Sequence, residues 1–164
     1  MSLPGGMRLE QVTAAHRDAI LEFEILNRDF FAAAIPDRGD DFFAHYPARH
    51  ADLLTLQAAG TDRFHVLVTE DGTIAGRFNL VRIDRGEAEL GYRVGEAFAG
   101  HGVATETVGK VCELARTDYG LTRLRARTTD DNHGSTKVLL RNGFTVVGQT
   151  VLNDRPAHLF ARDL

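Results

Sequence analysis

The chain has 164 residues, of which 43% are hydrophobic and 26% charged, as is ordinary for a soluble globular protein. Its length is most simply that of one domain with a sizeable core. A net charge of −4 argues against a nucleic-acid-binding protein, because phosphate contacts need a basic face. A local basic patch is one reading of Arg123, Arg125 and Arg127, which alternate along one strand-like run, and a solvated strand face is the favoured alternative.

The sequence also lacks the patterns of membrane-spanning and secreted proteins and those of disulfide and metal sites. No run approaches the ~20 apolar residues that span a bilayer, and no secretion signal is recognisable, so we expect a cytoplasmic protein with no membrane contact. Cys112 is the only cysteine, and neither HExxH nor CxxC spacing occurs, so we expect no internal disulfide and no metal site.

The N-terminal part reads as a strand followed by helices. Residues 1–6 are expected to be a disordered leader or an expression remnant, and residues 7–164 to form the domain. Alternating residues at 7–12 predict a strand, and Thr13 is placed to cap a helix that runs to about Asn27. Residues 28–47 are aromatic and contain breakers, which predicts an irregular segment, and 48–59 reads as a second helix.

In the middle of the chain, apolar and polar residues alternate with a period of two, as in strands. Residues 63–70, 73–83 and 87–94 are joined by short turns, of which Asp71-Gly72 is a strong hairpin signal. Three consecutive strands in an antiparallel meander are therefore predicted.

The C-terminal part alternates between segments with a helical pattern and segments with a strand pattern. A helix at about 103–118 is followed by a strand at 121–129, a short helix at 134–142, and a final hairpin of 145–152 with 158–164 across a loop containing Pro156. The prediction is a single-domain α+β fold with one mixed, mostly antiparallel sheet flanked by helices.

A glycine-rich segment joins the third strand of the meander to the next helix. Gly100 and Gly102 lie just before the helix starts, where unpaired backbone amides and the helix dipole favour a phosphate or pyrophosphate. A dinucleotide site would need a third glycine and a βαβ unit, and a P-loop would need GK followed by Ser or Thr. Neither pattern is present, and the pyrophosphate of coenzyme A fits best.

The sequence AFAGHGVATETV resembles the pyrophosphate-binding signature of the GCN5-related N-acetyltransferase (GNAT) superfamily, with Gly102 and Ala104 at matching positions. Ala99 departs from the pattern, because Gln or Arg is usual there. The segment NHGSTKVLLRNGF (132–144) is similar to a second signature of the family, Asn-x-x-Ser/Ala…Gly-Phe. Together with ELGYRV, these features resemble the RimJ/RimL-type subgroup, which acetylates ribosomal-protein N-termini and includes enzymes that act on small amines.

The resemblance implies that strand 87–94 splays from strand 121–129 and that acetyl-CoA, the implied cosubstrate, lies in the gap. The amide of Val94 would face the thioester oxygen, and amides of the glycine-rich loop would hold the pyrophosphate. The implied acetyl-CoA contacts are Tyr92, Val94, Ala99, Gly100, His101, Gly102, Val103, Ala104, Thr105, Asn132 and Ser135.

The implied reaction is direct attack of an amine on the thioester, and two residues are candidates for its catalysis. Glu89 is the candidate base, although a surface carboxylate is the alternative reading. Ser135 is the candidate acid, because the position where many relatives have Tyr is Leu139 here; the alternative is an ordinary hydroxyl at a helix N-terminus. Tyr92 is near the site by sequence but is also a candidate core residue.

The acceptor that the resemblance implies is a primary amine, either on a peptide or protein N-terminus or on a small molecule. We expect its pocket to form from 28–47, the first two helices and 152–158. Glu24, Asp37, Asp40 and Asp41 are candidates to attract a cationic amine, or are simply solvated. A catalytically inactive CoA-binding sensor or interaction module, and a nucleotide-binding regulatory domain, are the alternative functions, and a homodimer is possible.

Overall fold

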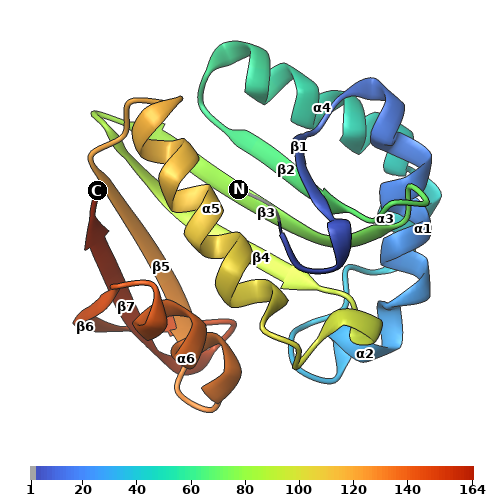
Figure 1. Ribbon diagram of the computed structural model, residues 1–164. Helices are drawn as coiled ribbons and strands as arrows, with labels where there is room; N and C mark the ends of the chain where they lie inside the picture. The colour runs from blue at the N-terminus through green and yellow to red at the C-terminus, as the bar shows by residue number, and fades with distance from the viewer. Residues whose placement is uncertain (1–2) are drawn as a thin grey trace.

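The computed structural model describes residues 3–164 as a sheet covered by helices on both faces (Figure 1). The helices are α1 (Arg17–Leu26), α2 (Arg28–Ala32), α3 (Asp40–Ala44), α4 (Tyr46–Ala59), α5 (Val103–Thr117) and α6 (His133–Arg141). The strands are β1 (Arg8–Gln11), β2 (Arg63–Val68), β3 (Ile74–Asp84), β4 (Glu87–Val94), β5 (Arg123–Thr129), β6 (Thr145–Leu152) and β7 (Arg155–Asp163).

The seven strands form one sheet in the order β1-β2-β3-β4-β5-β7-β6. All neighbours are antiparallel except β4 and β5, which are parallel and connected through α5. The predicted α+β class, the mixed sheet and the meander of β2, β3 and β4 are thereby confirmed.

The sheet opens in its middle. Strands β4 and β5 pair only from Glu87 to Glu89, opposite Arg123 to Arg125, and their ladder ends there. β4 continues for five more residues beside β3, while β5 continues beside β7. The predicted splay therefore lies between Leu90–Val94 on one side and the end of β5 on the other.

Alternation along the strands divides the core between the two faces of the sheet. Leu67, Phe78 and Leu90 belong to a cluster that packs against the apolar stripe of α5. Neighbouring positions such as Val66 and Val68 pack against α1 and α4 in a second cluster. Figure 1 shows α5 crossing the sheet on one side, with α1, α3 and α4 grouped apart from it.

Residues 28–47 are more regular than the sequence predicts. This segment contains α2 and α3, and Pro47 lies in the first turn of α4 rather than ahead of it. Proline fits there because its fixed φ suits a helix and the amide that it lacks would have no partner in a first turn.

Two terminal predictions also need correction. The predicted disordered leader, 1–6, covers residues 1 and 2, which lie outside the described part of the chain, but Leu3 is 6% exposed in the core and Pro4–Gly6 form a 3-10 turn. The final hairpin has a two-residue turn, Asn153-Asp154, with positive φ angles, so Pro156 lies in β7 and not in a loop. Among residues 3–164 no helix is long and apolar enough to cross a membrane.

Candidate active site

The glycine-rich loop presents its backbone to open space. Gly100 and Gly102 have φ of 78° and 75°, and a Cβ built on either would meet no atom within 4 Å. Gly102 precedes the first residue of α5, with no side chain capping the helix. The amides of residues 100–104 donate to no acceptor within residues 3–164. These free donors at a helix N-terminus fit a diphosphate group.

A cavity of about 710 Å³ lies directly against this loop. Most residues that the resemblance assigned to acetyl-CoA line it: Tyr92, Val94, Ala99, Gly100, Gly102, Val103, Ala104, Thr105, Asn132 and Ser135. His101 does not line the cavity and is exposed.

The backbone of Val94 faces the opening in the sheet. The Gly95 amide donates to the carbonyl of Ala75, a residue of β3, at 2.9 Å. Val94 lies opposite Gly76 in the same antiparallel pairing of β3 and β4. Because amides alternate in direction along an antiparallel strand, the amide of Val94 points away from β3. It points toward β5, which has already parted from β4 at this level. The predicted hydrogen-bond donor at this position is therefore available to a ligand.

Three polar side chains converge at the inner end of the cavity. Asn132 caps α6 by accepting a hydrogen bond from the Ser135 amide at 3.1 Å. The Ser135 Oγ lies 2.9 Å from the hydroxyl of Tyr92, whose ring stacks on Phe78 at 5.6 Å between centroids. Burial raises the pKa of Tyr92, while the bond to Ser135 works in the opposite direction, so the phenol holds its proton at neutral pH. A protonated phenol and a serine hydroxyl thus form a proton-donating pair.

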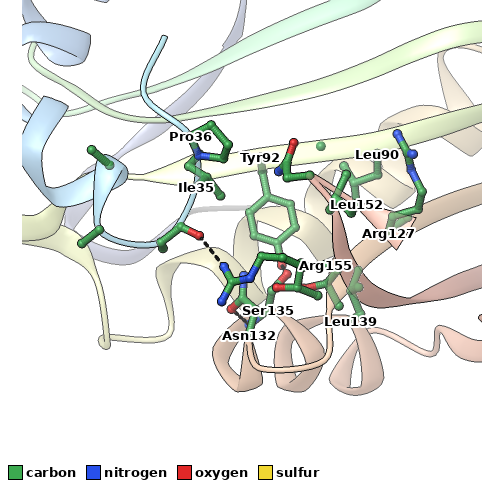
Figure 2. A pocket seen from close by; sticks show the side chains of 18 residues that line it. Ile35, Pro36, Leu90, Tyr92, Arg127, Asn132, Ser135, Leu139, Leu152 and Arg155 are labelled. Carbon is green, nitrogen blue, oxygen red and sulfur yellow. Dashed lines mark hydrogen bonds between the residues drawn. The ribbon is translucent and has the colours of Figure 1, made fainter. Parts of the chain in front are cut away.

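A second cavity, of about 420 Å³, meets the first at these residues (Figure 2). Tyr92, Asn132 and Ser135 line both cavities. The second is also bounded by residues 32–36, which begin with the last residue of α2, and by Leu152, Asn153 and Arg155 of the last hairpin. The predicted contributions of 28–47 and 152–158 to a pocket are therefore present, whereas α1 and α4 contribute none of its lining residues. The Tyr92 and Ser135 hydroxyls lie where two compartments join.

Glu89 has contacts that the sequence did not indicate. It lies on the sheet face opposite Leu90 and Tyr92 and lines neither of these two cavities. Its carboxylate accepts from the Nε of Arg127 at 2.6 Å and also pairs with Arg82. Both of its oxygens are thus engaged by guanidinium groups, of which Arg127 belongs to the lining of the second cavity and Arg82 does not.

The acidic residues suggested as attractants for an amine are engaged in ion pairs. Glu24 is 1% exposed and is shared by Arg38, Arg77 and Arg93. Asp37 and Asp40 pair with Arg28 at 2.8 Å, and Asp41 lies 2.9 Å from the His45 ring nitrogen, an ion pair only when that ring is protonated. None of these four carboxylates lines either cavity.

Lys137 and Arg141 were missed by the sequence analysis, and both line the first cavity. They lie one helical turn apart on α6, the helix that begins at Asn132. Neither side chain has an ion-pair partner within 4.0 Å among residues 3–164. Their spacing after the Asn-x-x-Ser segment was the available signal, because positions four apart on a helix share a face. They add positive charge beside the free amides of the loop.

Comparisons with known proteins agree with this geometry. The sequence profile described as "Acetyltransferase (GNAT) domain" matches residues 7–145. "Uncharacterized N-acetyltransferase p20" of Bacillus licheniformis is 34% identical over 80 residues, which cover 48% of this chain and only 45% of that protein. "Probable N-acetyltransferase YjcK" of Bacillus subtilis (strain 168) is 30% identical over 140 residues, which cover 82% of this chain and 76% of that protein. The crystal structure of ribosomal-protein-S5-alanine acetyltransferase from Vibrio fischeri superposes with a TM-score of 0.89 at 21% identity, covering 96% of this chain and 92% of that chain.

The fold and the loop thus define an acyl-CoA-dependent transferase. The chain belongs to the GNAT family of N-acetyltransferases, whose cosubstrate is acetyl-CoA and whose acceptors are amines. Its overall fold is that of the RimJ/RimL-type enzymes.

Proposed function

We propose that this protein transfers the acetyl group of acetyl-CoA by direct attack to a primary amine, on a peptide or protein N-terminus or on a small molecule. One observation carries the proposal: the cavity at the free amides of residues 100–104 meets a second cavity at the hydroxyls of Tyr92 and Ser135. Two compartments that share a proton-donating pair suit a donor and an acceptor that react where they meet.

The residues of this chain would divide the work as follows. The loop amides, with Lys137 and Arg141, bind the diphosphate end of the cosubstrate. The Val94 amide polarises the thioester carbonyl. The amine nitrogen bonds to the carbonyl carbon and gives up one proton, through water, to the proposed base Glu89. The carbon–sulfur bond breaks, and the departing thiolate takes a proton from the Tyr92–Ser135 pair.

Tyr92 thereby supplies the phenol that position 139 lacks. Leu139 is 1% exposed and cannot donate a proton, whereas Tyr92 reaches Ser135 from β4, on the other side of the cavity. The acid proposed from the sequence, Ser135, thus acts together with the Tyr92 hydroxyl and not alone.

Glu89 stays the proposed base, acting through water, and its ion pairs suggest a rival role. In that role it positions Arg127 at the wall of the second cavity. Glu89→Gln and Arg127→Gln distinguish the two. A base predicts that only Glu89→Gln removes the acidic limb of the pH profile of kcat/KM, whereas positioning predicts similar profiles for both variants.

Turnover tests the function itself. Acetyl-CoA is incubated with amines and N-terminal peptides while free thiol is measured, using wild type and Tyr92→Phe. We expect turnover by wild type and a loss in kcat of about 10²-fold in Tyr92→Phe, with the KM for acetyl-CoA within about threefold, because general acid catalysis contributes about 10²–10⁴-fold.

The alternative functions predict other results. Tight CoA binding with no turnover on any amine would favour the inactive sensor or interaction module. Greater thermal protection by ATP or NAD than by acetyl-CoA would favour the nucleotide-binding domain. The cytoplasmic location and the possible homodimer stay predictions from the sequence.

A further inference from the structure

The second cavity, which lies beyond Tyr92, carries positive and no negative side chains. No Asp or Glu of the described chain lines it, whereas Arg127 and Arg155 both do. Figure 2 shows the Arg155 guanidinium beside the Tyr92 ring, whereas Arg127 lies farther from the ring, beyond Leu90 and Leu152. A second ammonium group on an acceptor would therefore enter a site with no carboxylate to receive it, and would leave water at a cost.

The charge near Arg127 is not fully compensated. Glu89 is the carboxylate that pairs with Arg127, but it also pairs with Arg82, so two guanidinium groups share one carboxylate. The Arg127 bond to Glu89 uses Nε, which leaves the Nη donors of the same guanidinium without a partner within residues 3–164. The Arg127 guanidinium, whose residue lines the cavity, therefore retains unused donors on the sheet face that also carries Glu89.

Arg155 lies across the rim of the same cavity. Its Nη1 donates to the carbonyl of Ala34 at 3.3 Å, and its Nη2 pairs with Asp131. The side chain is 48% exposed, and its Nε has no acceptor within the described residues. Arg155 therefore joins the last hairpin to the segment after α2 while keeping its Nε as a charged hydrogen-bond donor for a ligand carboxylate.

From this arrangement we infer that the preferred acceptor carries a carboxylate within a few bonds of its primary amine. This inference rests on the proposed function and names the acceptor class. The shared chemistry is that of an amino-acid-like small molecule or of a peptide whose first or second residue is Asp or Glu. The volume of about 420 Å³ holds either the small molecule or the first residues of a peptide.

The test is a matched series of acceptors in which only the charge of one end changes. The small-molecule arm compares 4-aminobutyrate, butylamine and putrescine. The peptide arm compares hexapeptides that begin Ala-Glu, Ala-Gln and Ala-Lys and are otherwise identical. In at least one arm we expect kcat/KM for the carboxylate member to exceed that of the neutral member about 10-fold and that of the cationic member by more. The arm with the larger preference identifies the source of the carboxylate.

Variants of Arg155 test whether this residue causes the preference for acceptors that carry a carboxylate. We expect Arg155→Gln to reduce the ratio of carboxylate to neutral kcat/KM about 10-fold and Arg155→Glu to shift the preference toward the cationic member. Arg116→Gln, at an exposed position in the last turn of α5, should keep the wild-type ratio. Circular dichroism and thermal unfolding check that each variant is folded, and the ratio of two acceptors on one protein sample is insensitive to any inactive fraction.

The outcomes are distinct. Turnover in which neutral or cationic members equal or exceed the carboxylate member in both arms would overturn the inference alone. An unchanged ratio in Arg155→Glu would also overturn it. Turnover of no amine by a protein that binds acetyl-CoA would overturn the proposed function, and the inference with it.

Discussion

Replacing Glu24 by Gln should lower the stability of the protein more than any other single change of a carboxylate on α1. The Glu24 oxygens lie 2.9 Å from the Nη1 of Arg77 and 3.1 Å from the Nη1 of Arg93, and Arg38 lies at 3.3 Å. Gln keeps the shape and can still accept a bond from Arg77, but it leaves three guanidinium groups without their counter-charge. Removing one partner of a buried ion pair costs about 3–5 kcal/mol, and the retained hydrogen bond places this case near the lower end.

The assay is reversible unfolding in urea, with thermal unfolding alongside. At about 2–4 °C per kcal/mol for a chain of this size, a loss of about 3 kcal/mol lowers Tm by about 6–12 °C. The matched control is Glu22→Gln, at an exposed site on the same helix, for which a change below about 0.5 kcal/mol is expected. A free energy of unfolding for Glu24→Gln within about 1 kcal/mol of that control would refute the reasoning.

The pH dependence of the same variant supplies a second check. Burial works to raise the pKa of Glu24, but the charges of Arg38, Arg93 and Arg77 outweigh it, so the net pKa is lowered. A carboxylate with a lowered pKa in the folded state contributes stability above its unfolded pKa and loses it as the pH falls through the folded value. Glu24→Gln should therefore show a shallower loss of stability than wild type as the pH falls below about 4.5.

Three further predictions concern the loop, the core and the cavity. Gly102→Ala and Gly60→Ala, at φ of 75° and 78°, should each cost about 1–2 kcal/mol of stability, but only Gly102→Ala should weaken acetyl-CoA binding by calorimetry; equal dissociation constants would contradict the proposed role of the loop. Burial lowers the pKa of His65 to about 4, so as the pH falls the unfolded chain binds a proton at this imidazole before the folded chain does. The free energy of unfolding of wild type should therefore fall by about 3 kcal/mol between pH 6.5 and 4 from this group. A His65→Gln variant whose free energy of unfolding has the same pH dependence would contradict this. Lys137→Gln should weaken acetyl-CoA binding several-fold at low ionic strength and less in about 0.5 M NaCl, and a salt-independent difference would argue against a phosphate contact.

The order of elements could be predicted because hydrophobic periodicity is local. The strands at 63–68, 74–84 and 87–94 alternate apolar and polar residues, and their turns carry residues suited to positive φ. The segment after α1 was harder, because α2 and α3 are five residues each and too short to show a helical period. Aromatic packing between Phe23 and Phe31 accompanies these short helices, and such tertiary contact is not readable from the chain alone.

The candidate site could be predicted as far as backbone chemistry determines it. Glycines before a helix indicate where free amides lie, and Gly100 and Gly102 line the cavity. Partners across the fold could not be predicted: Tyr92 and Ser135 are 43 residues apart, and Arg155 and Ala34 are 121 apart. The pairing of Glu89 with Arg127 depends on the parallel register of β4 and β5, which no local pattern specifies.

Because the ladder between β4 and β5 is short, bound cosubstrate should contribute to the stability of the folded protein. Only three residue pairs connect the half of the sheet that begins with β1 to the half that ends with β6. A molecule held between the diverging strands touches both halves and binds only when they are assembled, so it opposes their separation by RT ln(1 + [L]/Kd). At 100 times the dissociation constant this amounts to about 2.7 kcal/mol. Scarcity of acetyl-CoA would then expose the chain to proteases sooner, and limited proteolysis with and without the cosubstrate would measure the difference.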